Sequence, residues 1–230
     1  MSWRAQKAGF PALFLSLLLL TPAPATFAQE PVVRPATASA ETAHDTVIVA
    51  FGDSLFSGFH LPREEGFAPT LERALVANGV RARVINAGIP GNTSAQGLQR
   101  LGTVLDGLDR KPDLVIVGLG ANDMLRGFDP SKPRANLEAI LLVLKQRGIP
   151  AMLTGSIAVE GRAEDYAAHF DSIYPQLAGK YDVPLYPFFL QGIFDHPDLM
   201  LADESHPSGR GVAEIVRRIL PTVEAALGPK

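Results

Sequence analysis

The chain has 230 residues, of which 47% are hydrophobic and 20% charged, and its formal net charge is −3 at pH 7. This balance is that of a globular protein with one well-buried domain, so it excludes wholesale disorder and leaves little length for a second domain. The slightly acidic charge offers no basic surface for nucleic acid, and the absence of cysteine excludes disulfides and thiolate metal ligands.

The first 28 residues differ in composition from everything after them. Arg4 and Lys7 precede an apolar stretch from Phe10 to Leu20, and small residues then lead to Ala28. This pattern predicts a secretory signal peptide over residues 1–28, cut after Ala28. The apolar stretch is well short of the roughly 20 residues that a spanning helix needs. We therefore expect an exported protein, periplasmic or secreted, whose mature chain has no stable membrane span.

Residues 29–45 are rich in Pro, Ala and Thr and lack helical or strand periodicity, which predicts a flexible tether before one domain over residues 46–230. Within that domain, apolar β-branched runs alternate with helix-like stretches. Strands are expected at 46–51, 81–86, 113–118 and 150–156, with a short fifth at 184–186, and helices at 69–77, 94–108, 133–147, 163–181 and 208–227. Alternation of this kind predicts an α/β domain in which helices cover a parallel sheet.

A serine follows directly on the first expected strand, which ends at Gly52, a residue that permits a sharp turn. Far along the chain, Asp203 and His206 lie on one short connection before the last expected helix. A serine hydroxyl becomes a good nucleophile when a histidine takes its proton and an acid orients that histidine. We predict these roles for Ser54, His206 and Asp203. The alternative is a plain turn and a solvated loop, because short motifs also occur by chance.

Four short segments, in order along the chain, resemble the motif blocks of the GDSL, or SGNH, hydrolases. They are GDSL at residues 52–55, NAGIPGNTS at 86–94, GLGAND at 118–123 and DESH at 203–206. The resemblance covers about residues 46–225. Within that family the chain is most similar to the small bacterial acyl-CoA thioesterase, lysophospholipase and arylesterase group, through LRGF at 125–128 and DVPLYPFF at 182–189.

The resemblance implies a three-layer α/β/α flavodoxin-like fold with about five parallel strands in the order 2-1-3-4-5. It also implies hydrolysis of esters or thioesters through an acyl-enzyme on Ser54, without a cofactor or metal. The backbone N–H groups of Ser54 and Gly91 and the side-chain amide of Asn122 would then form the oxyanion hole, where each donor is worth about 2.7–4 kcal/mol. Read without the family pattern, Gly91 would serve only a turn and Asn122 only a loop cap.

Three apolar residues are candidate walls of the substrate pocket: Leu125, Phe128 and Ile157. Packing of the same side chains onto the core is an equal alternative. The resembling group often carries a polar residue near positions 157–159, where this chain has Ile-Ala-Val. The acyl-chain preference therefore stays open.

Other titratable residues have weaker claims to the chemistry. We expect Asp53 to hold the turn before Ser54 through backbone hydrogen bonds, and Asp123 to be structural. His196 is a minor candidate for the base because it lies outside the matching block, and surface positions are expected for His44, His60 and His169. The Asp and His residues do not fall at recognisable metal-ligand spacings.

Three rival functions use the same features. A carbohydrate O-acetylesterase would keep the serine, the base and the donors and differ in its pocket. A nucleotide-binding module would need the phosphate-loop lysine and glycine spacing, which residues 52–54 lack. A non-catalytic binding module would have no reason to keep Ser54, Asp203 and His206 together. We expect a small acyl ester or thioester as the binding partner and a monomer, although no residue pattern fixes the oligomeric state.

Overall fold

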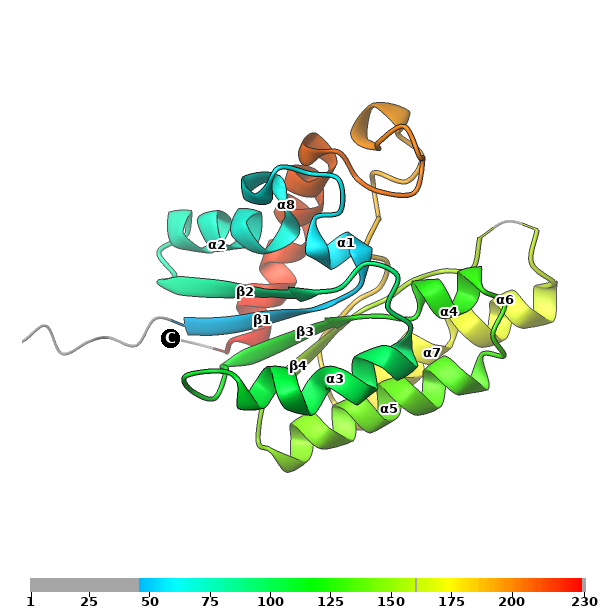
Figure 1. Ribbon diagram of the computed structural model, residues 1–230, viewed down its shortest axis with the longest axis horizontal. Helices are drawn as coiled ribbons and strands as arrows, with labels where there is room; N and C mark the ends of the chain where they lie inside the picture. Colours follow the sequence, from blue (N-terminus) through cyan, green and yellow to red (C-terminus); the bar gives the residue numbers. More distant parts are fainter. Residues whose placement is uncertain (1–45, 160, 229–230) are drawn as a thin grey trace, which may run out of the picture. The chain divides into compact units, whose positions relative to one another are not determined.

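Five parallel strands form the central sheet of the protein, in the order β2-β1-β3-β4-β5 (Figure 1). The structure, a computed structural model, describes residues 46–159 and 161–228, so the predicted signal peptide and tether lie outside the described residues. The strands are β1 (Thr46–Gly52), β2 (Ala82–Gly88), β3 (Leu114–Gly118), β4 (Ala151–Thr154) and β5 (Leu185–Tyr186). The strand number and order confirm the fold that the family resemblance implies.

Helices cover both faces of this sheet. Figure 1 shows α2 and α8 on one side and α3 and α5 on the other. The α-helices are α1 (Ser54–Ser57), α2 (Phe67–Ala77), α3 (Ser94–Asp106), α4 (Ala121–Leu125), α5 (Ser131–Gln146), α6 (Glu164–Asp171), α7 (Ile173–Tyr181) and α8 (Gly209–Ala226). Two 3₁₀ turns complete the description, η1 (Arg63–Glu65) and η2 (Pro197–Leu199). No helix among the described residues is long and apolar enough to cross a membrane.

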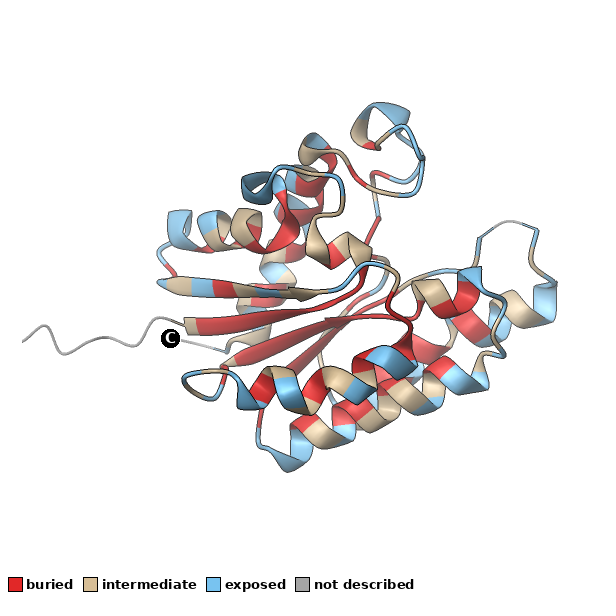
Figure 2. Ribbon diagram, viewed as in Figure 1, coloured by how far each residue is buried: buried red, intermediate tan, exposed pale blue. Residues whose placement is uncertain are grey.

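Each strand sends alternate side chains to two separate hydrophobic cores, because successive residues of a strand point to opposite faces. In β1, Ile48 and Ala50 belong to the core under α2 and α8, whereas Val49 and Phe51 belong to the core under α3 and α5. Burial on both faces explains why the strands read as continuous apolar runs, and Figure 2 shows the central strands as buried along their length.

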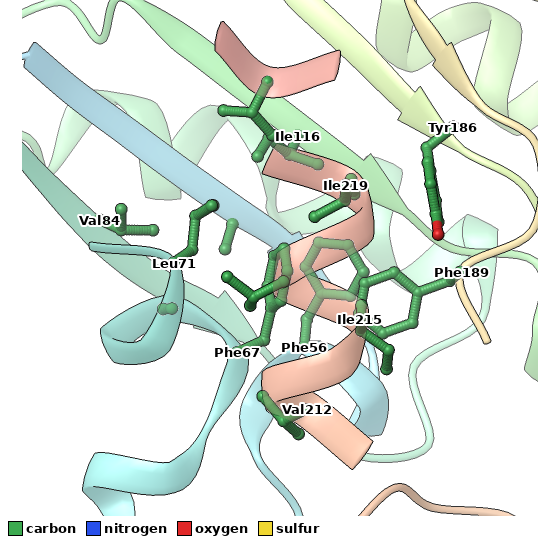
Figure 3. Packing of buried hydrophobic residues seen from close by; sticks show 14 of the residues in the cluster. Phe56, Phe67, Leu71, Val84, Ile116, Tyr186, Phe189, Val212, Ile215 and Ile219 are labelled. Atoms are coloured by element: carbon green, nitrogen blue, oxygen red, sulfur yellow. The ribbon is translucent and has the colours of Figure 1, made fainter. Parts of the chain in front are cut away.

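Aromatic side chains fill the first core beneath the end of β1 (Figure 3). The ring centroid of Phe56 lies 5.0 Å from that of Phe67 and 4.9 Å from that of Phe189, and all three side chains are buried. Rings at these separations add to the stabilisation that comes from burial alone. Because Phe56 belongs to α1, this packing fixes the short helix that begins at Ser54.

The single helix that we expected over residues 163–181 is wrong: the structure contains α6 and α7, separated at Ser172. Pro175 explains the break, since it has no backbone N–H and its ring crowds the carbonyl of Asp171 four residues earlier. The Ser172 hydroxyl donates to the carbonyl of His169 over 2.9 Å, which satisfies a group left at the end of α6.

Two short helices escaped sequence-based prediction, α1 and α4. Each spans about one turn at the C-terminal end of its strand, β1 or β3, so neither is long enough to show a helical period. These two elements carry Ser54 and Asn122. The parts of the fold that position candidate site residues are therefore the parts that periodicity cannot detect.

Candidate active site

Ser54 is the first residue of α1 and follows the C-terminal end of β1. Gly52 is required at this turn, because a Cβ there would lie 2.4 Å from Cγ of Phe56 and 2.7 Å from the carbonyl oxygen of Gly118. Asp53 caps the helix: its Oδ1 accepts a hydrogen bond from the N–H of Leu55 over 3.1 Å. This confirms that Asp53 holds the turn, and it places Ser54 at the sheet edge where ligands bind in such folds.

Asp203 and His206 share a tight loop between η2 and α8. Oδ1 of Asp203 accepts hydrogen bonds from the N–H groups of Ser205 and His206, each over 3.0 Å. The loop is closed at its base, where the N–H of Leu201 donates to the carbonyl of His206 over 2.7 Å. Glu204 at its tip has a φ of +54°, a left-handed conformation that is unusual for a residue with a Cβ. The loop thus fixes the separation of the acid and the histidine.

The fold brings Ser54, His206 and Asp203 into one hydrogen-bonded chain. Nδ1 of His206 lies 2.7 Å from Oδ2 of Asp203, and Nε2 lies 2.8 Å from Oγ of Ser54. A carboxylate can only accept, so Nδ1 carries the proton and Nε2 is left to accept from the Ser54 hydroxyl. This is the tautomer that a general base needs.

The electrostatics of the loop keep Asp203 ionised. Burial raises the pKa of its carboxyl, but the hydrogen bonds from Ser205 and from His206 outweigh that effect and lower the pKa to about 2. Asp203 therefore carries its negative charge throughout the neutral range. It can stabilise an imidazolium on His206 when that ring takes a proton.

Gly91 lies in the loop between β2 and α3, with a φ of +75° that glycine adopts without a steric penalty. Its carbonyl accepts a hydrogen bond from Nη2 of Arg126 over 2.8 Å, which ties this loop to the loop after α4. Among the described residues, the N–H groups of Ser54 and Gly91 have no acceptor. Two backbone donors are thus left open, one at the start of α1 and one in the loop after β2.

Asn122 lies in the first turn of α4, and its side-chain nitrogen already has two acceptors. Nδ2 donates to Oδ2 of Asp53 over 3.2 Å and to the carbonyl of Asn92 over 3.1 Å. Both distances are at the long end of the range for N–H···O bonds. The amide therefore joins the ends of β1 and β3 to the loop after β2.

The three predicted pocket residues do not behave alike. Leu125 and Ile157 are 56% and 40% exposed, so neither packs onto the core. Phe128 is half-buried, and the ammonium group of Lys132 lies 5.6 Å from its ring centroid. A cavity of about 20 Å³ lies under the sheet edge beside Asp53 and Leu55, close to the space that one water molecule needs.

Sequence reasoning missed two residues beside the site. Arg100 of α3 donates from Nε to Oδ1 of Asn92 and from Nη2 to the carbonyl of Gly52, each over 2.8 Å. Phe59 lies against the histidine, with 5.0 Å between its ring centroid and that of His206. An arginine on an amphipathic helix gives no sequence signal of such contacts. Phe59 follows the GDSL block closely, which is the one available hint.

The remaining candidate residues lie away from this chain of contacts. The surface positions predicted for His60 and His169 are confirmed. His196, the minor candidate for the base, is exposed as well. His44 lies outside the described residues. Asp123 is buried and accepts from the N–H and the hydroxyl of Ser94, a structural role as expected. In the described part of the chain, no group of three His, Asp or Glu side chains is placed to hold a metal.

Comparisons with known proteins agree on one family. The model of the GDSL-like lipase/acylhydrolase family matches residues 50–213. An arylesterase of Vibrio mimicus is 36% identical over 176 residues, which cover 75% of this chain and 87% of the relative. The thioesterase 1/protease 1/lysophospholipase L1 of Escherichia coli (strain K12) is 35% identical over 166 residues, covering 72% and 77%.

Solved structures give the same result. The crystal structure of AlinE4, an SGNH-hydrolase family esterase, matches with a TM-score of 0.69 and 48% sequence identity. The match covers 81% of this chain and 98% of that one. The residues matched by the family model, 50–213, include Ser54, Gly91, Asn122, Asp203 and His206.

Proposed function

Because this chain belongs to the GDSL-like lipase/acylhydrolase family, we propose that it hydrolyses carboxylic esters or thioesters through an acyl-enzyme on Ser54. The observation that carries the proposal is the hydrogen-bonded chain from Ser54 Oγ through His206 to Asp203, with 2.8 Å and 2.7 Å at its two links. A nucleophile, a base and an orienting acid in this arrangement are what acyl transfer requires.

The reaction proceeds in two steps. Oγ of Ser54 attacks the carbonyl carbon while Nε2 of His206 takes the hydroxyl proton, and the same nitrogen then protonates the leaving alcohol or thiol. Water attacks the acyl-enzyme with His206 again as base, which releases the acid and restores Ser54. The negative charge on the carbonyl oxygen falls to three donors, the N–H groups of Ser54 and Gly91 and the amide of Asn122.

We propose that the substrate's apolar part rests on exposed apolar side chains near Ser54. The cavity beside Asp53 and Leu55, at about 20 Å³, is too small for an acyl chain. Leu125, the last residue of α4, and Ile157, in the loop after β4, present exposed apolar side chains at the same sheet edge as Ser54. These features support esters with short acyl or aryl groups, and the names of the relatives make thioesters and lysophospholipids the further candidates to test.

The experiment measures hydrolysis of p-nitrophenyl esters over a range of acyl lengths, beside palmitoyl-CoA and a lysophospholipid. Ser54→Ala should abolish turnover of every substrate and leave the melting temperature within a few degrees of wild type. The matched control is Ser57→Ala, because Ser57 lies on the same short helix. The Ser57 hydroxyl donates to the backbone carbonyl of Ser54. Near wild-type hydrolysis by Ser54→Ala would overturn the proposal.

A further inference from the structure

A buried aspartate, Asp53, contacts Asn122, the proposed side-chain donor to the oxyanion. The mechanism described above gives this aspartate no role. Asp53 is 2% exposed, and both of its oxygens accept hydrogen bonds. Oδ1 accepts from the N–H of Leu55 over 3.1 Å, and Oδ2 accepts from Nδ2 of Asn122 over 3.2 Å. The first contact caps α1, while the second reaches across the sheet edge to α4. Capping alone therefore does not account for this carboxylate.

The contact between Asp53 and Asn122 fixes the orientation of the Asn122 side-chain amide. Asp53 Oδ2 and the Asn92 carbonyl are both acceptors, so they favour the orientation in which Nδ2 faces them. Rotating the amide by half a turn would set its oxygen against two other oxygens. An oxyanion hole needs the nitrogen, because an amide oxygen would repel the charge that develops on the substrate.

The second acceptor is held in place from another direction. Arg100 donates to the side chain of Asn92 and to the carbonyl of Gly52, which joins the loop after β2 to the end of β1. The N–H that donates to the Asn92 carbonyl is the one available to be shared with a substrate oxygen that becomes negative, because the other N–H donates to Asp53. The hydrogen bond to Asp53 remains in place and keeps the Asn122 amide in the same orientation.

We propose that Asp53 is a positioning residue whose ionised carboxylate holds the Asn122 amide with its nitrogen toward the forming oxyanion, and that protonation of Asp53 releases this hold. The proposal rests on the function proposed above, since it gives Asn122 a share of the oxyanion. Asp53, the second residue of the GDSL block, would thus affect the reaction indirectly, through the orientation of Asn122.

The surroundings of Asp53 bring its pKa close to the neutral range. Burial raises the pKa of Asp53 to about 6, against the hydrogen bonds from Leu55 and Asn122 and the charge of a protonated His206, which lower it. The other groups that interact electrostatically with this carboxylate are Arg100 of α3 and Tyr174 of α7. A protonated Oδ2 would present a donor to the Asn122 nitrogen, which then loses its acceptor.

A double-mutant cycle tests the proposal, with kcat and KM measured for wild type, Asp53→Asn, Asn122→Ala and the double variant on one p-nitrophenyl ester. Asn122→Ala should lower kcat by about 10²–10³-fold, the loss expected for one oxyanion donor. Asp53→Asn should lower kcat by about tenfold or more with little change in KM. In the Asn122→Ala background, Asp53→Asn should cost less than about threefold, because the residue through which it acts is gone.

The pH profile supplies a second measurement that needs no variant at Asp53. Wild-type kcat/KM should fall below about pH 6, because protonation of Asp53 releases the Asn122 amide and removes activity. The acid limb of Asn122→Ala should be shallower, since protonation of Asp53 can no longer act through the missing amide. Absorbance at the isosbestic wavelength of nitrophenol keeps the assay independent of pH.

The matched control is Asp113→Asn. Asp113 also accepts a backbone N–H from β1, that of Val47 over 2.7 Å, but it precedes β3 at the opposite edge of the sheet from Ser54. This variant should lower the melting temperature and leave kcat and the acid limb unchanged.

The outcomes separate the two proposals. If Asn122→Ala keeps wild-type kcat, the oxyanion role of Asn122 is wrong and the inference falls with it. If Asn122→Ala is impaired but the effects of the two substitutions multiply, or the acid limbs of wild type and Asn122→Ala coincide, the role of Asp53 is wrong while the proposed function stands.

Discussion

At the scale of single residues, the loop of Asp203 shows how a short segment orients the proposed general base, His206. One carboxylate takes hydrogen bonds from the N–H of Ser205, from the N–H of His206 and from the His206 ring. All three contacts arise within four consecutive residues, so the acid and base keep their geometry independently of the strands. The loop needs the rest of the fold for one purpose, to bring Nε2 to Ser54.

Asp53 predicts a measurable link between pH and stability. Burial raises its pKa from 3.8 to about 6, so the folded protein binds this proton more tightly than the unfolded chain does. The stability that the bound proton contributes is fully present below about pH 4 and is lost as the pH rises through 6. Between pH 4 and pH 7, wild type should lose about 2 kcal/mol of unfolding free energy relative to Asp53→Asn.

Urea unfolding of both proteins at a series of pH values measures this difference. The sign of this difference is the informative part. The unfolding free energy of Asp53→Asn should increase relative to that of wild type as the pH rises, whatever the absolute stability of the variant. The prediction would be contradicted by a difference that stays constant between pH 4 and pH 7, because Asp53 would then titrate alike in the folded and unfolded states.

The sequence indicates some of these residues and conceals others. Ser54, Asp203 and His206 stand out because reactive residue types follow a strand end and a loop signal. The contact between Asp53 and Asn122 joins residues 69 apart, and it exists only because β1 and β3 are neighbours in the sheet. Arg100 is hidden for the same reason, since its acceptors come from two other loops.

At the scale of elements, α8 combines a structural and a positional task. Its apolar face is buried along its whole length, and its N-cap Ser208 follows the histidine loop by two residues, accepting from the N–H of Gly211 over 3.2 Å. The packing of α8 therefore anchors the loop that carries His206. The position of the helix along the sheet decides where the base can reach.

Truncating the core of α8 should separate stability from catalysis. Ile219 is fully buried between α8 and the sheet, so Ile219→Ala should lower the unfolding free energy by about 2–5 kcal/mol. The residue lies about 16 Å along the helix from Ser208, and kcat at 25 °C should stay within about twofold of wild type. Chemical unfolding and steady-state kinetics on the same preparation check both halves.

Arg217→Ala serves as the control on the same helix. Its side chain is largely exposed and pairs with Glu214, so its loss should cost less than about 1 kcal/mol. A fall in kcat for Ile219→Ala that matches its loss of stability would contradict the prediction, because it would show that His206 depends on the packing at the far end of α8.

Element boundaries show where sequence patterns stop being informative. The strands and the long helices were predictable because apolar residues recur at their periods. The division between α6 and α7 depends on the missing N–H of Pro175, which a periodic pattern does not register. The short helix α1 depends on its cap by Asp53 and on the packing of Phe56, and α4 on the burial of Met124, all of which are set by the fold.

At the scale of the whole molecule, the parallel sheet places every candidate site segment on one edge. Ser54 follows β1, Gly91 follows β2 and Asn122 follows β3, and all three strands are adjacent. The same topology leaves the opposite edge free of these residues. Loop changes on the site edge can therefore alter substrate choice without disturbing the two cores.

We propose that the protein acts outside the cytoplasm, on the strength of the leader pattern in residues 1–28. Expressed with its full sequence in a bacterium that has a periplasm, the chain should be recovered from the periplasmic fraction or the medium, beginning at Gln29. Intact-mass measurement reads the cleavage site directly. Leu18→Arg, which interrupts the apolar stretch, should leave an uncleaved cytoplasmic chain, and recovery of wild type with Arg4 and Lys7 still attached would contradict the proposal.

Ser54 and His206, which lie 2.8 Å apart in the fold, are separated by 152 residues in the chain. A ribosome adding about 5–20 residues per second needs roughly 8–30 seconds to pass from one to the other. Throughout that interval a growing chain holds a nucleophile with no base, and even a complete chain stays inert until its last helix docks. Hydrolysis therefore requires the whole domain to be folded, because the proposed nucleophile and its base come from opposite ends of that domain.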